Sequence, residues 1–140
     1  MVNQVFVNLP VAHLQRSIAF FTALGFTFNP EWTNDSGACM NVTGNVFTML
    51  LTREHFQTFT PKAVADATST TEVLLCLSLD SRAAVDAIVE KAVRAGGKAH
   101  KEAQDHGFMY GHGFEDLDGH IWEVVYLEPQ AGSEPKQGAA

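Results

Sequence analysis

The same order of secondary-structure patterns occurs twice along the chain, and this repeat is the strongest constraint on its fold. Residues 4–9 have the pattern of a strand, and residues 11–25 carry apolar side chains at helical spacing, with Gly25 as the expected C-terminal stop of the helix. Strand patterns then continue to residue 51. A strand pattern begins again at Glu72, and a helix pattern follows with Ser81 as its expected N-cap. Three further strand patterns cover residues 98–104, 107–116 and 120–127. The sequence therefore predicts an α+β fold of two tandem βαβββ modules, offset by about 70 residues, that form a curved, cleft-enclosing mixed sheet.

Length and composition favour a single domain. The chain has 140 residues, of which 46% are hydrophobic, and this is enough for one core shared by two small modules. We expect one domain over residues 1–128, with module one at about 1–56, a polar, threonine-rich linker at 57–71 and module two at 72–128. Residues 129–140 are predicted to form a disordered tail.

The charge and the cysteines of the chain argue against several kinds of partner. The formal net charge is −7 and the nine Lys and Arg residues are scattered, so neither nucleic acid nor an anionic membrane surface is an expected partner. The N-terminus lacks the pattern of a signal peptide and no apolar run is long enough to span a membrane, so we expect a cytoplasmic protein. Cys39 and Cys76 are far apart without a CxxC motif, and both are predicted to be free, buried thiols.

Two segments at opposite ends of the chain resemble a known family. VNLPVAHLQRSIAFFTALGF, residues 7–26, is similar to the opening strand and helix of the vicinal oxygen chelate superfamily, and FEDLDGHIWEVVYLEP, residues 114–129, is similar to its closing motif. Members include glyoxalase I, extradiol dioxygenases, fosfomycin-modifying enzymes and bleomycin-binding resistance proteins. The resemblance implies a glyoxalase-like domain, a homodimer, a small-molecule ligand or substrate and, in the enzymes, a divalent metal in a cleft.

The resemblance also places the metal ligands of the enzymes on the first and last strands of each module. Aligning the two turn glycines, Gly44 and Gly119, pairs Thr48 with Glu123 in the repeat. The four corresponding positions are Phe6, Thr48, Leu74 and Glu123. Glu123 is the one ligand of the family type among them, whereas a transition-metal site needs at least three N, O or S ligands. We therefore expect that the metal site of the enzymes in this family is incomplete in this chain.

A displaced site stays open as an alternative. Side chains two residues apart share a strand face, so Asn8 and Glu72 are predicted to line a common space with Thr48 and Glu123. Two acids without histidine would hold a divalent metal only as a hard, weakly bound cation. The more modest interpretation is a polar patch in a ligand pocket.

Glu123 and three aromatic positions each have two interpretations. Glu123 is either a general base with a raised pKa, acting beside Thr48 or Asn8, or an ion-paired group in the cleft wall. Tyr110 and His112 alternate onto one strand face that lines either the cleft or the packed side of the sheet. Trp32 is either an aromatic wall for a planar ligand or a core residue. His120 and His100 are predicted to face solvent.

Three functions follow from these alternatives. The first is a glyoxalase-like or dioxygenase-like enzyme acting on a small oxygenated molecule, with Glu123 as base or remaining metal ligand. The second is a metal-free protein that binds or sequesters a small molecule, as the bleomycin-binding members do, with Asn8, Trp32, Thr48, Glu72, Tyr110 and His112 as binding residues. The third is a structural subunit without a small-molecule role.

Overall fold

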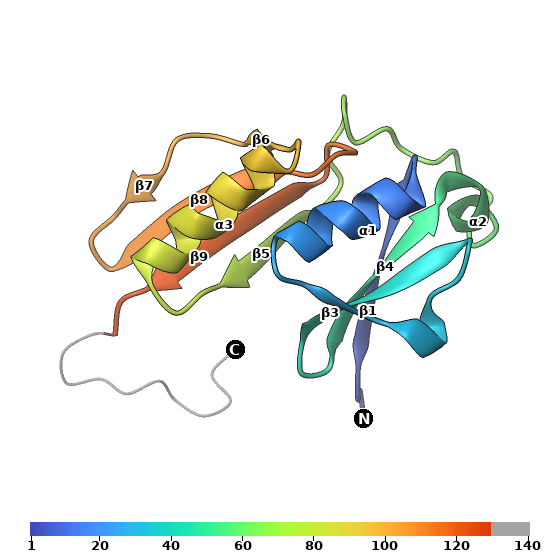
Figure 1. Cartoon of the computed structure of the whole chain (residues 1–140), viewed down its shortest axis with the longest axis horizontal. Coiled ribbons are helices and arrows are strands. Elements are labelled where there is room, and N and C mark those ends of the chain that lie inside the picture. Colours follow the sequence, from blue (N-terminus) through green and yellow to red (C-terminus); the bar gives the residue numbers. More distant parts are fainter. Residues whose placement is uncertain (130–140) are drawn as a thin grey trace.

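The computed structural model describes residues 1–129 and confirms the α+β class with two βαβββ modules (Figure 1). The strands form two separate mixed sheets, in which β1 pairs with β4 and β5 pairs with β9 in parallel, and the other pairs are antiparallel. Of the predicted tail, residues 130–140 lie outside the described residues. Within residues 1–129 no helix is both long enough and apolar enough to cross a membrane.

Module one contains a four-stranded sheet in the order β1-β4-β3-β2. Its elements are β1 (Val5–Val11), α1 (Leu14–Ala23), β2 (Thr27–Asn29), the 3-10 turn η1 (Pro30–Trp32), β3 (Gly37–Thr43) and β4 (Val46–Thr52). The helix α1 ends where Gly25 adopts a positive φ of 105°, and the N–H of Phe26 then donates to the carbonyl of Phe21. This is the glycine termination that the sequence predicts.

Module two contains the order β5-β9-β8-β6, with β7 also paired to β8. Its elements are β5 (Leu74–Ser78), α3 (Arg82–Arg94), β6 (Lys98–Ala99), β7 (Gln104–Asp105), β8 (Met109–Glu115) and β9 (Ile121–Leu127). The predicted N-cap of α3 is present, because the Ser81 hydroxyl accepts a hydrogen bond from the N–H of Ala84. The single strand predicted over residues 98–104 is instead two short strands, β6 and β7, joined by a loop.

One hydrophobic core joins the two modules through α1, which lies between the sheets in Figure 1. The ring of Phe21 on α1 packs edge-on against Trp122 of β9, with 5.3 Å between the ring centroids. The ring of Phe20 lies beside Phe114 of β8, with a centroid distance of 6.2 Å. All four side chains are almost fully buried. Burial of each aromatic side chain contributes roughly 1.5–3 kcal/mol, so α1 stabilises both modules at once.

The turn before β9 also connects the modules. Asp118 accepts hydrogen bonds from the N–H of Ala12 at 2.8 Å and from the Ser17 hydroxyl at 3.3 Å, and both donors lie at the start of α1. His120 donates from Nε2 to the carbonyl of Pro10 at 2.7 Å. His120 is therefore half-buried, and the prediction that it faces solvent is wrong.

The segment between the modules is held in place by hydrogen bonds. It begins with the short helix α2 (Arg53–Gln57), which extends past the predicted start of the linker. Arg53 donates to the carbonyls of Val64 and Ala65, and Gln57 donates to those of Thr60 and Lys62. In Figure 1 the connection runs from α2 of module one across the top of the view to β5 of module two.

Candidate functional site

Each sheet packs one face against the long helices α1 and α3 and leaves the other face without either of these two helices. Side chains alternate along a strand, and Leu50 of sheet one and Trp122 and Val124 of sheet two belong to the shared core. The neighbouring positions, among them Phe6 and Glu123, point the opposite way. We call these helix-free sides the open faces.

The predicted placement of Thr48 beside Glu123 is wrong. Thr48 pairs with Met40 across β3 and β4, is 1% exposed and lies on the helix-covered face. The turn between β8 and β9 is longer than the turn between β3 and β4, so an alignment of their glycines shifts the register by one residue. Such a shift moves a side chain to the other face of the sheet. The corresponding cross-strand pairs on the open faces are Phe6 with Phe47 and Cys76 with Glu123.

Glu123 lies on the open face of sheet two with two basic neighbours. Its Oε1 is 3.5 Å from Nζ of Lys101 and 3.9 Å from Nε2 of His100, and its side chain is 19% exposed. Gly113 of β8 makes room for the carboxylate, because a Cβ at that position would lie 3.0 Å from Oε2 of Glu123. On the other side, Cys76 is an exposed free thiol, which corrects its predicted burial. Partial burial and the Glu123 charge raise the pKa of Cys76, so this thiol is not activated as a nucleophile.

His100 and Lys101 are functional candidates that no motif in the sequence marks. His100, predicted to face solvent, has a side chain that is only 26% exposed. Its backbone N–H donates to the carbonyl of Gly113, which pairs with Glu123 across β8 and β9. The pairing register of these strands, which could have revealed the neighbourhood, is not readable from local sequence.

The groups around Glu123 do not match the needs of a resident divalent metal. Three or more N, O or S ligands are required, and within residues 1–129 no three His, Cys, Asp or Glu side chains are grouped to hold a metal ion. The ammonium of Lys101 lies beside the carboxylate and would repel a second cation. The four residues predicted to form a displaced metal site, Asn8, Thr48, Glu72 and Glu123, do not share one space, because Thr48 lies in the core.

Three aromatic rings form a stack on the open face of sheet one. Phe6 lies between Trp32, at a centroid distance of 5.7 Å, and Phe47, at 5.1 Å, with interplanar angles of 20° and 19°. Trp32 is 53% exposed and Phe6 is 36% exposed. Of the two interpretations of Trp32, the structure therefore favours the exposed aromatic wall over the core residue. We call Phe6, Trp32 and Phe47 the aromatic stack.

Asn8 and Glu72 meet at a cavity of about 340 Å³ between the modules. The end of β1, the start of β9 and the connecting segment form its walls. This volume lies in the lower part of the range for small-molecule sites. Two predicted binding residues thus share a space, but neither Glu123 nor Thr48 lines it.

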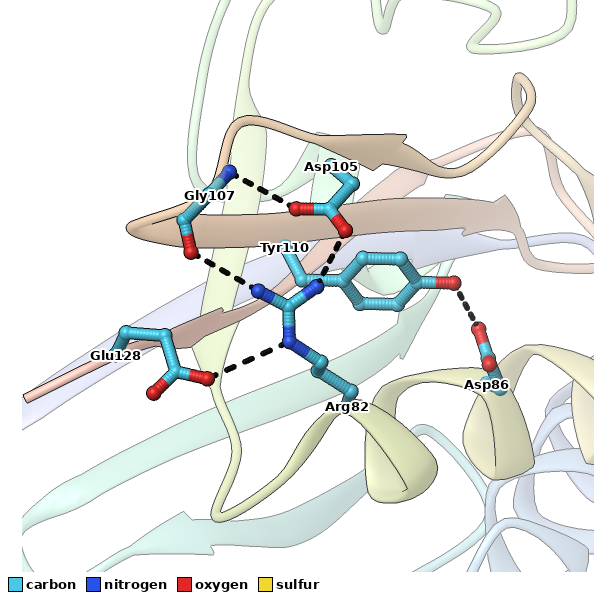
Figure 2. A network of polar contacts seen from close by, with 6 residues as sticks. All are labelled: Arg82, Asp86, Asp105, Gly107, Tyr110 and Glu128. Carbon is cyan, nitrogen blue, oxygen red and sulfur yellow. Dashed lines mark hydrogen bonds and ion pairs between the residues drawn. The ribbon is translucent and has the colours of Figure 1, made fainter.

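Tyr110 belongs to a structural network on the helix side of sheet two, and Figure 2 shows its hydroxyl directed at Asp86 of α3. That hydroxyl donates to Oδ1 of Asp86 at 2.6 Å, and this bond raises the pKa of Tyr110. The guanidinium of Arg82 lies 5.3 Å from the ring centroid. The predicted role of Tyr110 in ligand binding therefore gains no support from its position.

His112 also lies on the helix-covered face. It pairs with the fully buried Val124 across β8 and β9, so its face is the packed one rather than the cleft. Its Nδ1 is buried and has no hydrogen-bond partner in the described part of the chain. Neither His112 nor Tyr110 shares a face with Glu123.

Two mixed βαβββ sheets, a shared core and a ligand-sized cavity between the modules define the class of paired βαβββ proteins. The model of the Glyoxalase/Bleomycin resistance protein/Dioxygenase superfamily matches residues 3–124. The chain therefore belongs to this superfamily, as the two end segments predicted.

Solved structures agree with this assignment. A hypothetical protein from S. aureus is 29% identical, with a TM-score of 0.77 over 91% of this chain and 95% of that chain. A glyoxalase-related enzyme from Fulvimarina pelagi is 19% identical, with a TM-score of 0.77 over 96% of each chain. The fosfomycin resistance protein FosX from Listeria monocytogenes is 14% identical, with a TM-score of 0.66 over 90% and 93% of the two chains. The last two similarities show the fold alone. No curated protein matches the chain.

Proposed function

We propose that the chain is a small-molecule-binding member of its superfamily that holds a planar aromatic compound on the aromatic stack without a resident divalent metal. The observation that carries this proposal is the exposure of stacked rings on an open face. Exposed aromatic surface of this kind is costly in water and commonly marks a binding site. The net charge of −7 favours a cationic ligand over an anionic one.

The first test is ligand-induced stabilisation with proflavine, a planar cation, and with bleomycin, whose cationic tail carries a planar bithiazole. A ligand at one hundred times its dissociation constant stabilises the folded protein by roughly 2.7 kcal/mol, which a thermal melt detects. We expect the wild type to show this shift and Trp32→Ala to lose it. Phe59→Ala is the matched control, because Phe59 is 65% exposed and lies outside the stack. Equal shifts in both variants would refute a role for the aromatic stack.

A second candidate function rests on Glu123. A carboxylate beside Lys101 and His100 is arranged to remove a proton from a carbon next to a carbonyl, while Lys101 stabilises the resulting enolate. The proton moves from the substrate carbon to Glu123 and returns by the same path, so no metal or redox partner is needed. This would make the protein a proton-transfer enzyme acting on a small oxygenated molecule.

Proton exchange measured by NMR tests this candidate. A panel of α-hydroxy ketones in D₂O would exchange the α-proton faster with wild type, and Glu123→Gln would remove the acceleration. Glu115→Gln is the matched control, because Glu115 lies on the same open face two strand positions away, opposite Ile121. Exchange that persists in Glu123→Gln would exclude Glu123 as the base.

We also propose that the chain forms a homodimer. Two observations support it: β1 and β5 each end a sheet with an unpaired edge within the described residues, and Val5 and Leu74 on these strands are 48% and 54% exposed. Unpaired edges and exposed apolar side chains favour association. Sedimentation equilibrium should give about twice the 15.3 kDa chain mass, and a monomer at micromolar concentration would contradict the proposal.

A further inference from the structure

The cavity between the modules is a second candidate binding site, separate from the aromatic stack and from Glu123. Its walls are mainly apolar, with a few polar side chains at the edges, which is the usual composition of a small-molecule site. The larger apolar side chains are Leu9, Pro10, Phe56, Val64, Val73 and Ile121. The side chains with polar or charged groups include Asn8, Lys62, Glu72 and His120.

The wall that closes this cavity is built by specific contacts. Arg53 and Gln57 fix the backbone of residues 60–65 through four hydrogen bonds to carbonyls. At the other end of the segment, the chain lies against Gly119 so closely that a Cβ at Gly119 would come within 2.6 Å of the carbonyl oxygen of Ala67. A cavity with fixed walls loses little conformational entropy when a ligand enters.

The charges at the cavity have opposite signs. Lys62 and Glu72 both line it, and in the described part of the chain neither takes part in an ion pair. His120 donates its Nε2 proton to Pro10, so its Nδ1 is left as an acceptor when the ring is neutral. Asn8 offers both a donor and an acceptor.

We propose that this cavity binds a zwitterionic amino acid with an apolar side chain. Lys62 pairs with the ligand carboxylate, Glu72 pairs with its ammonium group, and the apolar walls receive the side chain. A simple anion would leave Glu72 as a repelling neighbour, and a simple cation would leave Lys62 in that role. A neutral apolar ligand would use neither charge. One ammonium and one carboxylate on a small apolar body satisfy both side chains.

Calorimetric titration with L-leucine and two analogues tests the charge requirement. L-leucinamide keeps the ammonium but lacks the carboxylate, and 4-methylpentanoate keeps the carboxylate but lacks the ammonium. We expect leucine, or another amino acid of the set valine, phenylalanine and methionine, to bind at least tenfold more tightly than both analogues. Absence of binding by all four amino acids, or equal binding of either analogue, would overturn the proposal.

Single charge removals identify the two groups. Lys62→Met should weaken leucine binding at least tenfold and should not weaken leucinamide binding, because it removes a repelling charge. Glu72→Gln should likewise weaken leucine binding and should not weaken 4-methylpentanoate binding. Lys98→Met and Glu102→Gln remove exposed charges away from the cavity and should bind leucine as wild type does. Unchanged binding in the Lys62 and Glu72 variants would refute the assignment. Trp32→Ala should keep leucine affinity, which separates this site from the aromatic stack.

Discussion

Asp116 shows at the scale of one residue why the closing motif of the chain has its sequence. Its side chain is buried, and its two oxygens accept hydrogen bonds from Nε1 of Trp122 at 3.0 Å and from the N–H groups of Asp118 and His120 at 2.9 and 3.0 Å. Burial raises the pKa of this carboxyl group, and the neighbouring donors oppose that shift. Asp116 and Asp118 therefore shape the turn and connect it to α1, whereas Glu123 lies on the open face of sheet two.

Removing the Asp116 carboxylate should be strongly destabilising. Asp116→Ala would leave three donors without their acceptor, including the buried indole N–H of Trp122. Since each unsatisfied buried donor costs roughly 1–3 kcal/mol, we expect a loss of about 3 kcal/mol or more. Urea denaturation measures it, with Asp35→Ala in an exposed turn as a control that should change stability by less than about 0.5 kcal/mol. A loss below 1 kcal/mol in Asp116→Ala would contradict this account.

Gly119 is a second residue whose identity the fold requires. It has a φ of 89°, and a methyl group there would collide with the backbone of Ala67. We expect Gly119→Ala to cost roughly 3 kcal/mol, because the conformational cost of about 1–2 kcal/mol adds to the displacement of the cavity wall. Gly107→Ala is a matched control, because Gly107 has a φ of 82° and open space around it. If thermal unfolding gave equal losses of stability in Gly119→Ala and Gly107→Ala, the close approach of Gly119 to Ala67 would not contribute to the cost.

The residues also show what the sequence reveals and what it hides. Gly25 and Ser81 act through local backbone chemistry, so the ends of α1 and α3 could be predicted. The placement of Thr48 depended on pairing register, which is set by turn length and core packing, and an error of one residue reversed its face. His100 approaches Glu123 only because β6 pairs with β8, a contact between segments that no local pattern encodes.

At the scale of elements, Arg82 connects the N-terminus of α3 to neighbouring segments of module two. The guanidinium donates to the Gly107 carbonyl at 2.9 Å, and forms ion pairs with Asp105 at 2.8 Å and Glu128 at 3.5 Å (Figure 2). One side chain thereby connects α3, the turn after β7 and the end of β9. The hydrogen bond from Gly107 and the Arg82 contact hold the pKa of Asp105 below its usual value.

This lowered pKa predicts how the network responds to acid. Because the folded state binds the Asp105 proton less tightly than the unfolded state, the contribution to stability is present above the unfolded pKa of about 3.9 and is lost as pH falls through the folded pKa. Wild type should therefore melt higher than Asp105→Asn at pH 6, and the gap should close below about pH 4. Thermal melts across this range check it, with exposed Asp35→Asn as reference. A gap that stays constant to pH 3 would contradict the proposed ion pair.

At the scale of the whole molecule, α1 makes one cooperative unit out of two modules. Phe21 belongs to module one, but its ring contacts Trp122 in module two. In the other direction, Asp118 of module two accepts hydrogen bonds from residues at the start of α1. The helix-facing sides of both sheets contribute to one hydrophobic core. The predicted single domain over residues 1–128 is therefore testable as a property of the folding transition.

Truncating Phe21 should destabilise both modules together. Phe21→Ala in a Trp32→Phe background leaves Trp122 as the one tryptophan, so fluorescence reports module two while the change lies in module one. A buried Phe→Ala substitution costs roughly 3–5 kcal/mol, and the urea midpoint should fall accordingly in both fluorescence and circular dichroism. Phe59→Ala, which removes an exposed ring, should leave the midpoint unchanged. If the Trp122 transition kept its midpoint in Phe21→Ala while the dichroism signal split in two, the modules would unfold independently and the shared core would not couple them.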